Sequence, residues 1–269
     1  MANPTIFFDN VLEDGTLTAA SSAEDSAYPL ANVTDWRMGG PFRFRITDTG
    51  GTTIKVDSGG ANLTCDTTAM AGHTAGTESA SWAVAHSAND SDWTDSFTAE
   101  AVGTTDLPVM RTFTSAADRY WRIVFTGNPY TDPLQIGILT LGVRLDLEVG
   151  AQPDLDPYGV RAVTDESQSR TGSPIGVNVR YRSKQFNLSY PEPGMTKTGF
   201  YAPASGLTFD DDFIPHAIDS AKPFFFNWNI TEDPTEVYLG WTRGVRMPFV
   251  GSTARRGLSM QIEGYREIA

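Results

Sequence analysis

The chain has 269 residues, of which 40% are hydrophobic, and a formal net charge of −13. That apolar content supports a folded core and argues against disorder, while the acidic balance argues against binding to nucleic acid. No run of 18 apolar residues is present and the N-terminal residues lack a basic start, so we expect neither a membrane-spanning helix nor a signal peptide. The single cysteine, Cys65, excludes an intrachain disulfide and indicates a reducing compartment.

Apolar and polar residues alternate along several short segments, which predicts β-strands with one buried and one solvated face. In the first half these segments are 42–46, 53–57, 81–86, 121–125 and 143–149. Turns rich in glycine, asparagine and proline separate them, and helical periodicity is nearly absent, with room for a turn or two at 26–37 and 213–221. The pattern predicts an all-β protein that contains an antiparallel sandwich.

A segment with two prolines, 150–158, separates the two halves of the chain. Because proline cannot donate to a sheet ladder, we interpret it as a linker between a sandwich, 1–149, and a second, smaller β domain, 159–269. Residues 1–150 carry 19 acidic against 8 basic residues, a net charge of −11, whereas the remainder has a net charge of −2. Further strands are predicted at 177–181, 185–190, 236–241 and 258–263. The segment 191–223 shows no period of either kind, and an irregular segment of this length predicts a functional role.

Six motifs follow one another in a recognisable order in the first half, at 28–36, 54–57, 62–73, 79–95, 119–123 and 136–142. The most specific are an Ala-Gly-His turn ending at His73, an Asn-Asp-Ser-Asp-Trp turn ending at Trp93 and a Tyr-Trp-Arg strand ending at Arg122. This order resembles the discoidin-like (coagulation factor 5/8 C-type, galactose-binding-like) sandwich, in the form carried by tail proteins of tailed bacteriophages. The resemblance implies an eight-stranded jelly roll whose loops at one end bind sugars or other surface ligands.

The second half is more loosely similar to the C-terminal part of phage tail-tip or baseplate proteins, through 223–228, 236–240 and 258–264. The combined resemblance implies a structural virion protein of a tailed phage (a tail-tip, baseplate or fibre-attachment component) assembled in the bacterial cytoplasm. Its implied partners are other tail proteins, further copies of itself and a cell-surface glycan, without membrane insertion. A free carbohydrate-binding module is the alternative. A glycan-cleaving enzyme is a third reading, which the carboxylates do not support.

The sequence contains no catalytic or metal-binding signature, so we expect a non-enzymatic protein without a cofactor. The three histidines, His73, His86 and His216, are isolated, and no zinc, nucleophile-elbow or phosphate-loop spacing appears. The carboxylates of 210–212 would alternate in direction along an extended segment, which indicates a solvated loop rather than a calcium site or a hydrolytic pair. Calcium is left open at the acidic turn 89–92.

A glycan site needs an aromatic face for the sugar ring, with amide and carboxylate groups nearby for its hydroxyls. Trp93 offers that face in a turn, and the predicted site also includes His73, Asn89, Asp90 and Asp92. In the alternative interpretation, Trp93 anchors its own hairpin and His73 caps a turn, so that neither meets a ligand.

Aromatic residues of the second half are assigned to an assembly interface, because such contacts are enriched in aromatic side chains. They are Tyr201, Phe209, Phe224, Phe225, Phe226 and Trp228. The alternative for the 224–226 run beside Trp228 is the hydrophobic core. In the predicted arrangement the acidic first half faces outward, with Trp93 and His73 accessible, and the more neutral second half docks into the assembly.

Overall fold

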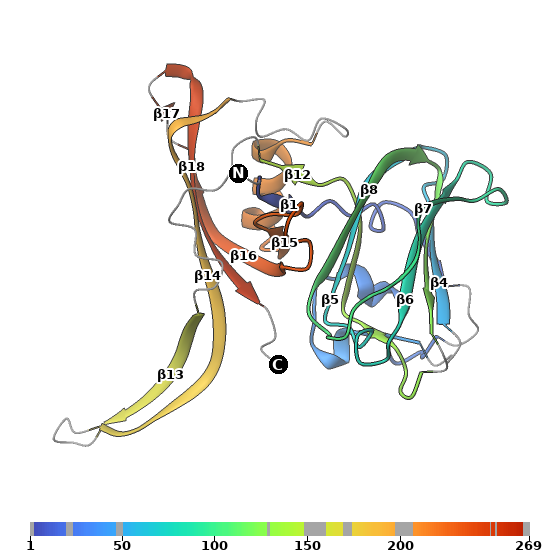
Figure 1. Cartoon of the computed structure of the whole chain (residues 1–269), viewed down its shortest axis with the longest axis horizontal. Helices are drawn as coiled ribbons and strands as arrows, with labels where there is room; N and C mark the ends of the chain where they lie inside the picture. Colours follow the sequence, from blue (N-terminus) through green and yellow to red (C-terminus); the bar gives the residue numbers. More distant parts are fainter. Residues whose placement is uncertain are drawn as a thin grey trace.

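The computed structural model describes residues 3–19, 24–46, 51–127, 130–147, 160–168, 174–196, 207–247, 249–250 and 252–265. Within these ranges the chain is nearly all β-structure, which confirms the predicted fold class. Figure 1 shows two bodies side by side and a hairpin arm that extends from one of them. No helix in the described ranges is long and apolar enough to cross a membrane.

The strands fall into two groups by body. The first body holds β2 (Thr16–Ala19), β3 (Phe44–Arg45), β4 (Gly51–Asp57), β5 (Leu63–Ala71), β6 (Ser81–Ser87), β7 (Thr94–Ala101), β8 (Val109–Asp118), β9 (Tyr120–Thr126), β10 (Gln135–Ile136) and β11 (Ile138–Gly142), with 3₁₀ turns η1 (Leu30–Thr34) and η2 (Gly40–Phe42). The second holds β1 (Thr5–Phe7), β12 (Leu145–Asp146), β13 (Val160–Gln168), β14 (Pro174–Thr196), β15 (Phe224–Asn227), β16 (Val237–Arg246), β17 (Phe249–Val250) and β18 (Ser252–Tyr265), with π-helical turns η4 (Phe209–Phe213) and η5 (Pro215–Asp219).

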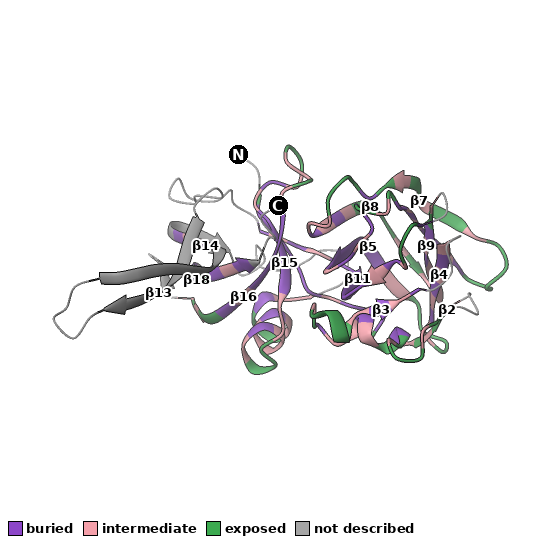
Figure 2. Ribbon diagram, turned by 90° about the horizontal axis from the view of Figure 1, so that it is seen from below, coloured by how far each residue is buried: buried purple, intermediate pink, exposed green. Residues whose placement is uncertain are grey.

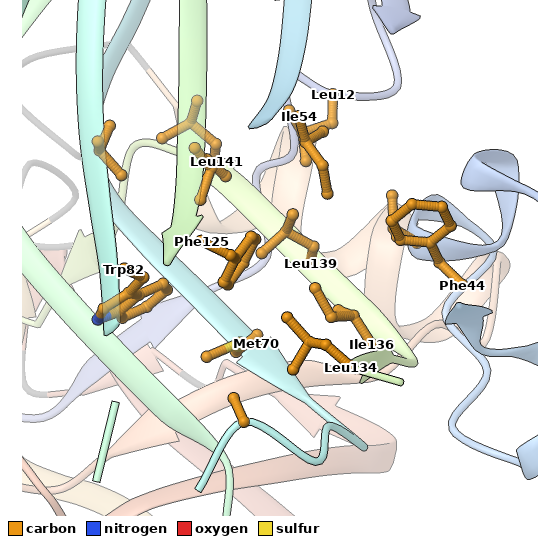
Figure 3. Close-up of a cluster of buried hydrophobic side chains, with 14 of the residues drawn as sticks. Leu12, Phe44, Ile54, Met70, Trp82, Phe125, Leu134, Ile136, Leu139 and Leu141 are labelled. Carbon is orange, nitrogen blue, oxygen red and sulfur yellow. The ribbon is translucent and has the colours of Figure 1, made fainter. Parts of the chain in front are cut away.

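The first body is an antiparallel sandwich of two sheets. One sheet has the order β2-β4-β9-β6-β7 and the other has the order β11-β5-β8, so their described strands form the eight-stranded sandwich that the sequence resemblance implies. Trp82 and Phe125 of the first sheet face Met70 and Leu139 of the second across the core (Figure 3). The predicted alternation is confirmed in β4 and β9, which bury every second residue on this side.

The second body is built on one antiparallel sheet with the order β12-β1-β15-β16-β18-β14-β13, in which β17 also pairs with β18. Two of its strands come from the first half of the sequence, because Ile6 of β1 lies opposite Phe226 of β15 on one side and Leu145 of β12 on the other. Its core includes five apolar side chains from that half: Ile6, Phe8, Val143, Leu145 and Leu147.

The sandwich is therefore an insertion, 10–142, into the second body, and the predicted division into 1–149 and 159–269 is corrected accordingly. The chain leaves the sheet after β1 and returns to it at β12, and these two strands are neighbours. The predicted linker, 150–158, lies outside the described residues. Alternation along a strand reports which side chains are buried but not which sheet the strand joins, so the sequence pattern missed this connection.

The three-stranded sheet of the sandwich is covered on both faces, and the buried surfaces of the two bodies meet there (Figure 2). One face of this sheet lines the sandwich core. On the other face, Ala69, Met110 and Ile138 form one buried cluster with Phe225 and Leu239 of the second body. The expectation of one buried and one solvated face thus applies to the five-stranded sheet and not to this one.

Polar side chains tie together the two points where the chain crosses between the bodies. The amide of Val143 donates to Asp9 Oδ2 at 2.9 Å, and Asn10 Nδ2 donates to the carbonyl of Leu139 at 3.2 Å. A side chain at Gly142 would collide with Asp9, because an ideal Cβ there would lie 2.5 Å from Oδ2. Burial raises the pKa of Asp9 from its usual 3.8 to about 6, so this junction contains a carboxyl that titrates in mildly acidic solution.

Two expectations for the second half are corrected by the backbone. The segments 177–181 and 185–190 are parts of one long strand, β14, whose partner β13 the sequence pattern did not reveal. The carboxylates of 210–212 lie in the helical turn η4 instead of an extended loop, and Thr208 Oγ1 caps this turn by accepting from the amide of Asp211 at 2.9 Å. Acidic residues in a first turn favour such a start through the helix dipole.

Candidate functional site

The residues predicted to bind a glycan do not come together. His73 precedes β6 and the 89–93 turn follows it, so they lie at opposite ends of a seven-residue strand. At about 3.3 Å per residue, this strand separates them by roughly 20 Å. The expected proximity of His73 to Trp93 is therefore wrong.

The polar side chains of the 89–93 turn make hydrogen bonds within the turn itself. Asn89 Oδ1 accepts from the amides of Ser91 and Asp92 at 3.0 and 2.9 Å, and Asn89 Nδ2 donates to Asp92 Oδ2 at 2.7 Å. Asp90 adopts a left-handed backbone with φ 63° and pairs with Lys55 at 2.7 Å. These contacts are the local hydrogen bonds that build a tight turn.

Trp93 is half-buried against the outer face of the five-stranded sheet, where the guanidinium of Arg122 lies 4.2 Å from the centre of its ring. A cation over an indole face contributes about 0.5–1 kcal/mol at an exposed site. The contact fixes the turn to the neighbouring strand β9. This is the geometry of the alternative interpretation, in which Trp93 anchors its own hairpin.

His73 is only 2% exposed, so the prediction that it remains accessible is wrong. Its Nδ1 accepts from the amide of Ala75 at 3.2 Å and its Nε2 donates to the carbonyl of Leu107 at 2.9 Å, which requires the neutral Nε2–H form. Burial lowers the pKa of His73 from 6.5 to about 4, so the ring is uncharged at neutral pH. It caps one turn and holds the turn beside it.

A cavity of about 280 Å³ opens at the His73 end of the sandwich. Its walls come from three turns, and they place Arg43 and Asp106 around one space together with the backbone of Gly39 and Gly72. Both oxygens of Asp106 are held by Thr77, whose amide and hydroxyl donate to them at 2.9 and 2.7 Å. The cavity therefore presents a fixed acceptor group close to a guanidinium.

Arg43 differs from most cations of the sandwich in having no acidic partner. Seven Lys and Arg residues lie between 10 and 142. Five of them pair with carboxylates: Arg37, Arg45, Lys55, Arg111 and Arg119. Among the described residues, Arg43 and Arg122 have no such pair; Arg122 covers Trp93, whereas Arg43 Nε donates to the carbonyl of Met38 at 2.9 Å and its side chain lines the cavity.

An aromatic ring lies beside this cavity. Phe42 is the one large apolar side chain classed as exposed among the described residues, at 40%. It closes the turn η2, next to the lining residues Gly40 and Arg43, and the Arg37 guanidinium covers its ring at 4.2 Å. The alternation at 42–46 pointed to Phe42 and Arg43 only as parts of a strand. No sequence signal pairs them with Asp106, because Asp106 lies in the loop between β7 and β8, more than 60 residues further along the chain.

Four of the six residues assigned to an assembly interface lie in the hydrophobic core. Phe209, Phe224, Phe225 and Phe226 have no exposed surface, which corrects that assignment and, for the 224–226 run, supports the core alternative. Trp228 is half-buried, and its Nε1 donates to Glu236 Oε2 at 2.7 Å. Tyr201 lies outside the described residues.

No group of three or more His, Cys, Asp or Glu side chains in the described ranges is arranged to hold a metal ion. Carboxylates do gather around a cavity of about 310 Å³ where the two bodies meet, with Asp9, Asp14, Asp211 and Asp212 in its lining beside His216. Cys65 is buried, and burial raises the pKa of its thiol well above the usual value, so it is not a reactive thiolate.

No protein-family model matches this sequence, and no curated protein does either. Solved structures show a likeness over about half of the chain. The module titled CBM32 of AlyQ, in complex with 4,5-unsaturated mannuronic acid, is 23% identical over 50% of this chain and 96% of its own, with a TM-score of 0.39. The family 32 module of NanJ from C. perfringens, in complex with galactose, is 13% identical over 51% of this chain and 98% of its own, with a TM-score of 0.40. A pectin-binding carbohydrate-binding module is 15% identical over 47% of this chain and 88% of its own, with a TM-score of 0.39.

Proposed function

We propose that this protein is a non-catalytic binding protein whose sandwich holds a glycan in the cavity between Arg43 and Asp106. The observation that carries the proposal is the cavity itself: a guanidinium that pairs with no described carboxylate and a fixed carboxylate share one space beside an exposed ring. Its volume of about 280 Å³ is close to the lower end of the range for small-molecule sites, roughly 300–1,000 Å³, which suits one sugar unit.

The groups around the cavity match the chemistry of a sugar. Hydroxyl groups both donate and accept hydrogen bonds, so a carboxylate and a guanidinium together can bind neighbouring hydroxyls. Asp106 is already oriented by Thr77, which reduces the entropy lost when a ligand binds. Phe42 adds an apolar face for the C–H side of a ring.

Calorimetric titration with sugars selected on a glycan array tests this proposal. We expect Arg43→Gln and Asp106→Asn to weaken binding about 10- to 100-fold, the effect of losing a hydrogen bond to a charged group. Arg122→Gln is the matched control, because it removes the other cation of the sandwich that pairs with no described carboxylate, at the end where Trp93 lies. Loss of binding in Trp93→Ala with full binding in Arg43→Gln would move the site to the 89–93 turn. The absence of any sugar ligand for the wild-type protein would overturn the glycan function.

A structural role in a tailed-phage virion, with other tail proteins as partners, is the second candidate. It comes from the sequence resemblance, and the arm formed by β13 and β14 favours it, because an element that extends from the body of a protein suits contact with neighbours (Figure 1). Mass spectrometry of purified particles from the source, together with antibody labelling of the tail, tests it. The protein should be found in the tail, and its absence from intact particles would leave only the free binding module.

A further inference from the structure

Among the described strands, the arm is held to the rest of the molecule at one end only. β13 pairs with β14 alone, from Val160 opposite Lys184 to Gln168 opposite Pro174. The pairing of β14 with β18 starts at Lys184, so the backbone before that residue has no other neighbour among the described strands. Nine residues of strand span roughly 30 Å. Figure 1 shows this arm on the side of the sheet body that is opposite the sandwich.

Such an arm is poorly stabilised by the chain itself. A hairpin of two strands with no sheet or helix behind it is at best marginally stable in water. The outer edge of β13 also offers a row of backbone donors and acceptors that no described strand satisfies. Both features point to a partner that adds to the edge.

The charge of the arm indicates the nature of that partner. The described strand residues of the arm, 160–168 and 174–184, carry four basic against two acidic residues, a net charge of +2 in a chain of net −13. The sandwich, 10–142, carries 16 acidic against 7 basic residues, a net charge of −9. Opposite net charges steer two surfaces together, and here both surfaces belong to the same protein.

One edge strand of the sandwich, β7, suits the arm: its outer backbone edge pairs with no described strand, although its side chains also contact β8, where Arg111 pairs with Glu100. β7 closes the five-stranded sheet, pairs with β6 alone in the described part of that sheet, and is eight residues long against nine in β13. Asp95 on this edge is exposed and has no ion-pair partner among the described residues, and Asp90 and Asp92 lie in the turn just before it. The opposite edge, β2, has four residues and no carboxylate.

We propose that the β13–β14 arm docks on the β7 edge of a second copy of this chain. The arm cannot reach its own β7, since the sheet body lies between them (Figure 1). The contact therefore joins two different surfaces, head to tail, and repeats from copy to copy into a closed ring or an open filament. The inference does not depend on glycan binding.

Sedimentation of the full chain as a function of concentration and salt tests this contact. The wild-type protein should associate, and raising the salt from about 0.05 M to about 0.5 M should weaken association, because the Debye length falls severalfold. Arg180→Glu with Arg182→Glu on the arm, and Asp95→Lys on the edge, should each raise the concentration needed for association by about tenfold or more. Asp132→Lys reverses another exposed carboxylate of the sandwich and should leave association unchanged.

A mixture of the two variants identifies the head-to-tail arrangement. The arm variant keeps an intact edge and the edge variant keeps an intact arm, so together they should form one-to-one complexes that grow no further. Retained melting temperatures would show that both variants are folded. A wild-type chain that stays monomeric at high concentration would overturn the proposal, as would association that neither variant weakens, or mixed complexes that continue to grow.

Discussion

The two bodies of this protein are assembled in different ways from the sequence. The sandwich draws its core from one continuous stretch, from Val11 to Leu141. The sheet body draws its core from both ends of the chain, because Ile6 and Phe8 pack with residues beyond 142. The order of domains along the chain is thus not N-terminal and C-terminal, but one body inserted into the other. A cut at the proline-containing segment would leave the sandwich whole and divide the sheet body.

The contact between the two bodies is buried and contains both apolar and polar interactions. Phe7 and Phe225 pack with their ring centres 6.3 Å apart in a buried cluster that includes Ala69 and Met110 of the sandwich. Trp36 Nε1 donates to Glu13 Oε1 at 2.5 Å, and Lys222 of the sheet body pairs with Glu13 Oε2 at 2.8 Å. Apolar contact combined with fixed polar contacts couples the two bodies, so we expect the whole chain to unfold in a single transition.

The largest expected effect comes from cutting the chain. A fragment of 150–269 lacks β1, β12 and the five core side chains that the first half supplies. At about 1.5–3 kcal/mol for each buried side chain, the loss is on the order of 10 kcal/mol, as large as the stability of a whole domain. We expect this fragment to be unfolded by circular dichroism and 10–142 to be β-rich and to melt cooperatively. Cooperative melting of 150–269 alone would show that the two bodies are sequential after all.

A smaller effect is expected from removing one ring of the contact between the bodies. Phe225→Ala deletes a fully buried side chain and should lower the free energy of unfolding by about 3–5 kcal/mol. Because Phe225 lies between the bodies, calorimetry should resolve two transitions in the variant and one in the wild type. Phe97→Ala, at the half-buried edge of the sandwich, is the control and should keep a single transition. If both variants keep one transition, the contact does not couple the bodies.

The smallest effect is a pH dependence that separates the junction from the sandwich. Folding raises the pKa of Asp9 to about 6, so its favourable contribution is complete below pH 3.8 and is lost as the pH rises through about 6. At pH 8 the ionised, buried carboxylate then costs about 3 kcal/mol. Asp9→Asn should therefore raise the free energy of unfolding at pH 8 and leave it unchanged near pH 3.8, as measured by urea titration.

The effect of His73 on the pH dependence of stability is opposite to that of Asp9, because folding lowers the pKa of His73 to about 4. Its contribution is present above pH 6.5 and is lost as the pH falls through about 4. In the wild type the effects of Asp9 and His73 on the free energy of unfolding largely cancel between pH 4 and 6.5. In Asp9→Asn only the effect of His73 remains, so the free energy of unfolding should fall by about 3 kcal/mol as the pH is lowered from 6.5 to 4. Asp132→Asn, an exposed carboxyl, should follow the wild type. Parallel profiles for wild type and Asp9→Asn would mean that Asp9 does not titrate as a buried group.

Local patterns were sufficient for some residues of the candidate sites and insufficient for others. The turn chemistry of Asn89 and Asp92 could be read from their spacing, and so could the anchoring of Trp93. The burial of His73 could not, because a histidine beside glycine looks the same in the sequence whether it faces solvent or Leu107. Arg43 and Asp106 could not be paired either, since they meet only where two loops close over one end of the sandwich.

The sequence by itself determined the fold class and most strands of the sandwich, because alternation with period two is a property of each segment alone. Only the tertiary structure decided which sheet β1 and β12 join, which face of β5 a second body covers, and which cations have no carboxylate partner among the described residues. These outcomes depend on pairing and packing between segments far apart in the chain, and no local pattern records them.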